Sequence, residues 1–378
     1  MAVTRARAAR SVLHEAKVPP ASSPKRNGRH PEPQTEPPDN LVELEPPGRP
    51  GEPAEPAPDS SRPTLGPSPG SIAPSDLLAV AGRKAMWVHL DRLLTREPGA
   101  RDPGRPDELR KYRVATRRLR AALRMFAPAY PDREVRPLRR GLADLADIIG
   151  GLRDLDNRVA NLNQWAIERD PGSRAAVSPL LLAWSAERER AAAALHDRLE
   201  TRRHRRLLNA LVVFVEPGPL RRGKRSEDPH TIGDRIASML WAAYEDVRAY
   251  APIVRWADVE TLHDLRISTK RLRDDIDFLA QILGPQRGPL SERLVALQDH
   301  LGALNDAAVA ATAARTFLED RHATLSPEEQ AEIAAYLSHR EREVARLRRT
   351  SVQRWRPVAG IAFARRLARL VVVPAGMP

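Results

Sequence analysis

Eleven residues decide the fold of this chain: Arg110-Lys-Tyr-Arg-Val-Ala-Thr-Arg-Arg-Leu-Arg120. On a helix, four of its arginines and Arg124 beyond it fall within an arc of about 80°, along a line about 21 Å long. We call this row the first stripe: Arg110, Arg113, Arg117, Arg120 and Arg124. The adjoining side of the helix is apolar, with Tyr112, Leu119, Leu123 and Phe126. The segment therefore predicts an amphipathic helix that buries one face and presents guanidinium groups beside it.

The same pattern recurs as His263-Asp-Leu-Arg-Ile-Ser-Thr-Lys-Arg-Leu-Arg273, 153 residues further along the chain. The second stripe consists of His263, Arg266, Lys270 and Arg273. Its helix also has an apolar side, which we expect to face the core: Leu265, Leu272, Ile276 and Leu279. Because Asp277 stands where the first copy has Arg124, we expect the second stripe to be shorter and weaker.

A second pair of segments supports an internal repeat. Leu145-Ala-Asp-Ile-Ile-Gly-Gly-Leu-Arg-Asp154 recurs as Leu297-Gln-Asp-His-Leu-Gly-Ala-Leu-Asn-Asp306, at an offset of 152 residues. Two motifs in the same order, at nearly the same offset, indicate a tandem duplication. With four helices in each half and short loops between them, the sequence predicts an all-α fold of two four-helix bundles.

Helical periodicity begins after Pro74 and is interrupted at proline and glycine clusters. It predicts helices over about 75–96, 107–127, 133–168, 173–215, 230–250, 259–283, 289–320 and 326–369. Residues 1–74 contain 17 of the 35 prolines, which predicts a disordered arm. The remaining layout is a first half over 75–215, a linker over 216–229, a second half over 230–370 and a tail over 371–378.

The charge of the chain belongs to its folded part. The sequence has 62 Lys and Arg against 49 Asp and Glu, a formal net charge of +13. The arm over 1–74 has nine of each, so the whole excess lies on residues 75–378. No cysteine is present, which excludes disulfides and thiolate chemistry. No stretch is apolar for the roughly 18 residues that span a bilayer, and no apolar core follows Arg10, so we expect a cytoplasmic protein without membrane insertion.

The first stripe is unusual for a solvated charged face. Such a face normally alternates charges at i, i+4, whereas like charges at this spacing repel by a few tenths of a kcal/mol. The stripe lacks such opposite charges, and a row of cations recurs in the second copy. An anion bound along the row would offset the repulsion, and the planar guanidinium group can hold phosphate oxygens bidentately.

These two motifs resemble those of the CHAD domain family, α-helical domains named for conserved histidines. The similarity covers residues 75 to about 370 and includes the His-x-x-Arg-Val-x-x-Arg-Arg-Leu-Arg and Leu-Gly-x-Leu-Arg-Asp elements. It implies a pair of four-helix bundles related by pseudo-twofold symmetry, with a basic central groove that binds inorganic polyphosphate. It also implies a place at polyphosphate granules, and no cofactor.

The resemblance carries over residue by residue. The polyphosphate-binding residues that the motifs and stripes imply are Arg110, Arg113, Arg117, Arg118, Arg120, Arg124, Arg153, His263, Arg266, Lys270, Arg271 and Arg273. The first copy departs from the family at Arg110, where the signature has histidine, and the second at Asn305, where it has arginine. Asp154 and Asp306 match the acidic position, which can either ligate a metal that bridges to phosphate or hold a neighbouring arginine in place; we favour the second role.

Three functional hypotheses follow. The first is a non-enzymatic polyphosphate-binding protein, without catalytic or metal-ligating residues. The second is a nucleic-acid-binding protein, which would need aromatic side chains for stacking beside the cations. The signature helices offer only Tyr112, Phe126 and Phe278, and the first two fall on the apolar face. The third is an accessory domain of an enzyme acting on phosphate esters; no P-loop, nucleophile elbow or His-x-x-x-His pair supports it.

Overall fold

The computed structural model describes residues 63–102, 104–169, 171–216 and 230–372. The first half of this region contains α2 (Leu78–Ala100), α3 (Pro106–Met125), α4 (Asp132–Ile167), α5 (Pro171–Ala176), α6 (Ser178–Glu200) and α7 (Arg202–Val215). The second half contains α8 (Ile232–Arg248), α9 (Val259–Phe278), α10 (Ala280–Leu283), α11 (Gly288–Arg321), α12 (Pro327–Ala359) and α13 (Ile361–Val371). Short 3₁₀ turns lie at Ala127–Ala129, Pro285–Arg287 and His322–Thr324. The prediction of an all-helical fold is confirmed: within the described ranges no strand forms.

Several predicted helices are shorter than expected. The predicted helix over 173–215 breaks at Thr201, because the Thr201 hydroxyl accepts a hydrogen bond from the His204 N–H and thereby caps α7. The predicted helix over 326–369 ends at Gly360, which has extended backbone between α12 and α13. The predicted helix over 259–283 is interrupted at Leu279.

The apolar sides of both signature helices lie in the main core, as predicted. The side chains of Tyr112, Leu119 and Leu123 on α3, and of Phe126 at its C-cap, are all fully buried. The same holds for Leu265, Leu272 and Ile276 on α9 and for Leu279 at its C-cap. Burial of a large apolar side chain contributes about 1.5–3 kcal/mol, so these eight residues fix the rotation of both helices and the direction of their cationic sides.

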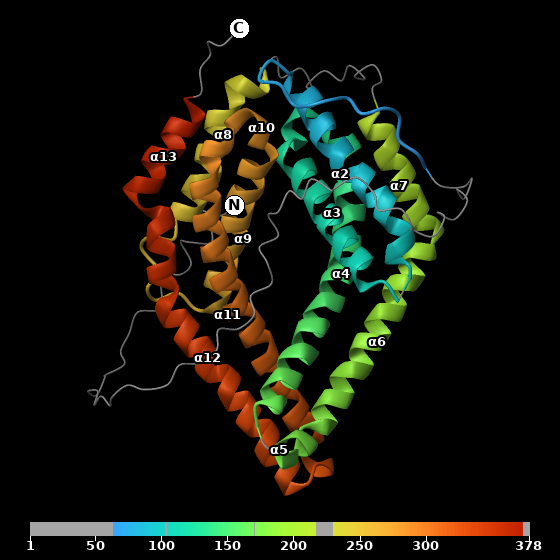
Figure 1. The fold of residues 1–378 in the computed structure, drawn as a ribbon, viewed down its shortest axis with the longest axis vertical. Coiled ribbons are helices and arrows are strands. Elements are labelled where there is room, and N and C mark those ends of the chain that lie inside the picture. Colours follow the sequence, from blue (N-terminus) through green and yellow to red (C-terminus); the bar gives the residue numbers. More distant parts are fainter. Residues whose placement is uncertain (1–62, 103, 170, 217–229, 373–378) are drawn as a thin grey trace, which may run out of the picture. The chain divides into compact units, whose positions relative to one another are not determined.

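A second apolar core joins the two halves at another place. Leu162 and Trp165 of α4 and Trp184 of α6 pack with Ile333 and Tyr336 of α12. The Trp165 and Tyr336 rings meet edge to face, with centroids 5.2 Å apart. Figure 1 shows α4 and α11 approaching each other towards the end of the fold that carries α5. The two long helices are therefore held together at that end.

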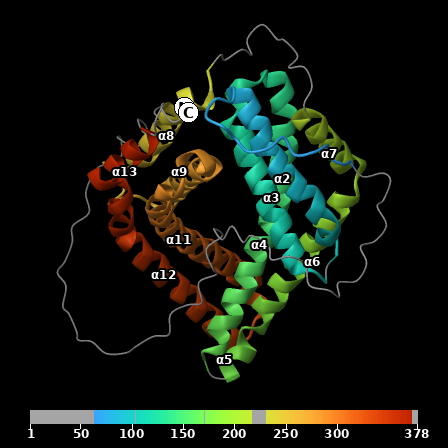
Figure 2. The ribbon, with the colours of Figure 1, turned by 45° about the horizontal axis from the view of Figure 1, so that its top comes forward.

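The segment before α2 and the first residue of that helix are bound to the second half, and we call these residues, 72–78, the strap. The Ile72 N–H donates to Gln281 Oε1 at 3.0 Å, and the Leu78 N–H donates to the His230 carbonyl at 3.2 Å. In return, the N–H groups of Ile232 and Gly233 donate to the carbonyls of Asp76 and Pro74, at 2.8 and 2.9 Å. Figure 2 shows the segment before α2 close to the start of α8.

The strap corrects the boundary of the predicted disordered arm. Leu65 and Ile72 pack against the main core, so residues 63–74 belong to the folded part. Residues 1–62, most of the predicted linker (217–229) and residues 373–378 of the predicted tail lie outside the described residues. Within the described ranges, no helix has the length and apolar character needed to cross a bilayer.

Candidate functional site

The signature helices α3 and α9 contact each other, and two ion pairs link them. Arg118 Nη2 lies 3.0 Å from Asp277 Oδ2, and Arg124 Nη2 lies 2.8 Å from Asp275 Oδ1. Arg118 also lies over the ring of Phe278, 5.9 Å from its centroid. Two arginines expected to contact phosphate are thus held by carboxylates of the opposite half.

The other residues of the first stripe differ in exposure. Arg110 and Arg120 are exposed, whereas Arg113 and Arg117, which lie between them in the row, are half-buried. Arg120 lies 3.8 Å from Asp147 of α4, and both side chains are largely exposed, so this pair contributes little. Of this row, Arg117 acts on Lys270 of α9 and Arg124 pairs with Asp275 of the same helix.

The second stripe is more buried than the sequence indicates. Arg273 is only 2% exposed, because it lies where α9 packs beneath α3, and this corrects its expected place on an open face. Arg266 and Lys270 are half-buried, whereas Arg271 is exposed. Within the described part of the chain, Nε of Arg266 and both Nε and Nη2 of Arg273 are buried without a hydrogen-bond partner.

The two stripes come together in one group of cations. We call this group the cation cluster: Arg117, Arg153, Arg266, Lys270 and Arg273. Burial and the charges of Arg117, Arg266 and Arg273 lower the pKa of Lys270 to about 7, against the opposing effect of Asp274. Burial also lowers the pKa of Arg266, with further lowering by Arg153 and Arg117. Residues from α3, α4 and α9 thus lie within electrostatic reach of one another.

The second repeated element lies beside this cluster. His263 Nδ1 is 2.8 Å from Asn305 Oδ1, which connects α9 to α11. A Cβ atom built on Gly302 of α11 would lie 3.7 Å from Arg266 Nε, in ordinary van der Waals contact. Gly302 is the glycine shared by both copies of the element, and Arg266 lies within van der Waals reach of α11 at this position.

Asp154 and Asp306 come from the two halves and influence each other. Partial desolvation and the negative charge of Asp306 raise the pKa of the Asp154 carboxyl, although the residue as a whole stays exposed. Asn157 Nδ2 donates to Asp306 Oδ2 at 3.4 Å. Both carboxylates also act on Arg266 and oppose the lowering of its pKa. This arrangement fits carboxylates that hold an arginine in place, and no group of three or more potential metal ligands occurs among the described residues.

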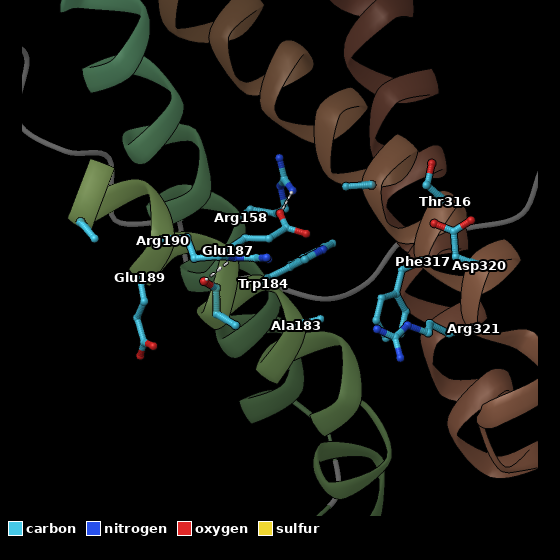
Figure 3. Close-up of a pocket in the computed structure, with 13 residues that line it drawn as sticks. Arg158, Ala183, Trp184, Glu187, Glu189, Arg190, Thr316, Phe317, Asp320 and Arg321 are labelled. Atoms are coloured by element: carbon cyan, nitrogen blue, oxygen red, sulfur yellow. Dashed lines mark hydrogen bonds and ion pairs between the residues drawn. The ribbon is translucent and has the colours of Figure 1, made fainter. Parts of the chain in front are cut away.

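A cavity of about 920 Å³ lies away from the cation cluster, between α6 and α11. It is lined by Arg158 of α4 and by residues of these two helices. Figure 3 shows Trp184, Glu187 and Arg190 of α6 across from Phe317, Asp320 and Arg321 of α11. Arg158 lies over the Trp184 ring and 3.4 Å from Glu187. The cavity is lined by side chains of both charges and by none of the predicted binding residues. It therefore does not belong to the candidate site.

The site includes acidic residues that the sequence analysis missed. Asp274 and Asp275 stand where the first copy has Ala121 and Ala122, and Asp275 pairs with Arg124 across the interface. Burial raises the pKa of Asp275 to about 6. In the sequence, these two carboxylates appear only as a difference between the copies. Their role depends on the contact between α9 and α3, which the sequence does not reveal.

Comparison with known proteins agrees with this architecture. The CHAD domain family matches residues 84–315 of the chain. Among solved structures, the CHAD domain from the plant Ricinus communis is similar with a TM-score of 0.58 at 20% identity, covering 81% of this chain and 96% of that one. PptA from Streptomyces chartreusis gives a TM-score of 0.61 at 17% identity, covering 74% of this chain and 99% of that one. No curated protein matches the chain. Because the family match spans more than half of its 378 residues, the chain belongs to the CHAD domain family.

Proposed function

We propose that this chain binds inorganic polyphosphate, without catalysing a reaction on it, at the cation cluster between α3 and α9. The half-buried cations Arg113, Arg117, Arg153, Arg266 and Lys270 would contact the polymer, with His263 donating a hydrogen bond. Arg110, Arg120 and Arg271 would extend the surface along the chain of phosphates. Arg118, Arg124 and Arg273 would support the site from behind.

The lowered pKa of Lys270 carries this proposal. Three arginines that cannot deprotonate at neutral pH act on one lysine, while Asp274 alone offsets them. Crowding cations away from water disfavours their charged forms. A polyanion drawn into the cluster would reverse that cost, since each phosphate supplies a negative charge and oxygens that accept from guanidinium groups.

A regular phosphate polymer suits the cluster better than a nucleic acid. Stacking on exposed aromatic side chains supplies much of the affinity for single strands. On the signature helices, Tyr112 and Phe126 are fully buried and Phe278 is 8% exposed. Trp256 is 73% exposed, but it precedes α9 and lies outside the stripe. The cluster therefore offers charge and hydrogen bonds without a surface on which bases could stack.

The repeat suggests how one polymer would meet both halves. We interpret α2–α7 and α8–α13 as the two copies of a tandem duplication related by a pseudo-twofold axis, with the copies of the signature on α3 and α9. A groove lined by both stripes would then follow the crossing of these helices, and attachment to polyphosphate granules would follow from binding several phosphates at once.

Competition at matched charge tests the proposal. Labelled long-chain polyphosphate is bound to the protein and challenged with RNA and DNA oligonucleotides of equal total charge, at fixed ionic strength. We expect polyphosphate to remain bound, and its affinity to fall steeply with salt as neutralised phosphates release counterions. Displacement by RNA or DNA at equal charge would instead support nucleic-acid binding, and phosphate released during incubation would contradict a non-catalytic role.

A further inference from the structure

The last arginine of the first stripe is held by a carboxylate of the second copy. Arg124 Nη2 lies 2.8 Å from Asp275 Oδ1 across the contact between α3 and α9. Arg124 follows Arg117 by seven residues, so it lies about two turns further along α3 on the same side of the helix. The ion pair therefore occupies a guanidinium group that shares a helix face with cations assigned to the polymer.

The Arg124 pair is open to solvent, whereas its neighbour is not. Asp277 lies 3.0 Å from Arg118 and 3.4 Å from Arg287. In the pair with Arg118, that arginine is 14% exposed and Asp277 is 8% exposed. The Arg124 side chain is 32% exposed, so a ligand can reach its guanidinium group. The contact between Arg124 and Asp275 can thus be exchanged for a contact with phosphate, while the pair between Arg118 and Asp277 stays enclosed.

The carboxylate of Asp275 is a feature of the second copy alone. It stands where the first copy has Ala122. On α9 it follows Arg271 by four residues, a spacing at which opposite charges attract on a helix. Asp275 therefore serves one cation of its own helix and one of the opposite half. Its oxygens accept from a guanidinium group as phosphate oxygens do.

We propose that Asp275 competes with polyphosphate for Arg124 and thereby limits the number of phosphates that the first stripe binds. While Asp275 holds Arg124, the polymer meets one cation fewer than the row contains. Each neutralised phosphate adds to the affinity and to its dependence on salt. The carboxylate lowers both and favours release of the polymer. The inference rests on the proposed function and names the residue that restrains it.

Removal of the Asp275 carboxylate from the full chain tests the inference. Asp275→Ala gives the second copy the alanine of the first, and the matched control is Asp144→Ala, which breaks the pair between Asp144 and Arg203. Binding of long polyphosphate is measured over a series of salt concentrations at pH 7.5, where Asp275 is ionised because its pKa is about 6.

We expect Asp275→Ala to bind the polymer about threefold to tenfold more tightly at low salt, the range for one added ion pair. The slope of log affinity against log salt concentration should steepen by about one unit, as one more phosphate is neutralised. Asp144→Ala should give the affinity and the slope of the unchanged protein.

A double-mutant cycle identifies the cation that is released. In Asp275→Ala combined with Arg124→Gln, both the gain in affinity and the steeper slope should disappear. If the gain persists, the carboxylate acts only as a distant negative charge and the proposal is wrong. Weaker binding by a folded Asp275→Ala variant would also overturn it, because Asp275 would then be positioning Arg124 for the polymer.

Arg124→Gln alone covers the case in which circular dichroism shows that Asp275→Ala is unfolded. With Asp275 in place, this change should weaken binding several-fold less than Arg117→Gln does; equal losses would show that Arg124 is already available to phosphate, against the proposal. The unchanged protein separates this inference from the proposed function. Absence of polyphosphate binding by that protein overturns both, whereas normal binding with a different ranking of the variants overturns only the competition by Asp275.

Discussion

The two copies of the signature carry similar charges in different environments. On α3, Arg110 and Arg120 of the first stripe are exposed, whereas Arg113, Arg117 and Arg124 are half-buried. On α9, Arg273 is nearly inaccessible, and burial lowers the pKa values of Arg266 and Lys270. Because the pKa of Lys270 is about 7, a count of basic residues overstates the positive charge that this side chain of the second copy holds at neutral pH. The comparison teaches that burial, as well as sequence, sets the charge a site can offer.

The largest effect is expected from reversing charge in the middle of the first stripe. Arg113→Glu with Arg117→Glu should abolish measurable polyphosphate binding, a loss of at least about a hundredfold, because phosphates lose cationic partners and meet carboxylates. Helix content and melting temperature should stay near those of the unchanged protein, since both residues lie off the apolar face. Calorimetric titration and circular dichroism check both statements. Arg365→Glu with Arg369→Glu, on exposed positions of α13, is the matched control and should bind nearly normally.

The next prediction compares the copies directly. At pH 7, Arg117→Glu should weaken polyphosphate binding more than Lys270→Glu, because Arg117 carries a full charge whereas Lys270 carries about half of one in the empty site. At pH 6, where Lys270 is mostly protonated, the two losses should approach each other. If Lys270→Glu is the more damaging change at pH 7, the second copy dominates and our ranking of the copies is wrong.

The pH dependence of binding sharpens the comparison further. Lys270 has its pKa lowered to about 7, so it is charged below this pH and loses its proton above it. Binding of a polyanion raises that pKa, and affinity should therefore fall as the pH rises from 6 to 8, by up to about tenfold per pH unit above 7. Lys270→Arg, which is charged throughout, should flatten the profile and strengthen binding at pH 8.

His263→Ala is the control for this experiment, because His263 belongs to the same stripe as Lys270. Both experiments use long polyphosphate, so that the terminal phosphate groups of the polymer contribute little to the measured pH dependence. If His263→Ala flattens the profile and Lys270→Arg leaves it unchanged, Lys270 is not the source of the pH dependence.

The smallest effects concern the connection between the halves. Removal of residues 1–62, which carry nine basic and nine acidic side chains, should change polyphosphate affinity by less than tenfold, or about 1.4 kcal/mol.

Removal of residues 1–76 also deletes most of the strap and should lower the melting temperature, because Gln281 and the N–H groups of Ile232 and Gly233 lose partners. Equal melting temperatures for the two truncations would show that the strap does not stabilise the fold.

Most of the helical framework could be predicted from periodicity in the sequence. The apolar faces of α3 and α9 were predicted correctly because a 3.6-residue period directly reports which side is buried. The breaks at Thr201 and Gly360 were missed, since helical periodicity continues across them and the bend depends on packing between neighbouring helices. The boundary at residue 74 was misplaced because proline content says nothing about hydrogen bonds to residues 230–233 and 281.

The candidate site was less accessible from sequence. Spacing identified which cations share a helix face, but it could not reveal that α3 and α9 face each other. The pairing of Arg118 and Arg124 with Asp277 and Asp275, and the burial of Arg273, depend on that contact. Pairing and desolvation are properties of tertiary structure, and they decide which arginines are available to a ligand.

The strap has a consequence for synthesis. Ile72 and Gln281 are separated by 209 positions in the chain, which correspond to about 10–40 s of translation at 5–20 residues per second. During this interval the first half leaves the ribosome while the partners of its leading segment do not yet exist. We therefore expect the segment that precedes α2 in the nascent chain to acquire protease resistance in a late step, after residue 281 has emerged. This segment is then fixed later than many residues that are translated after it.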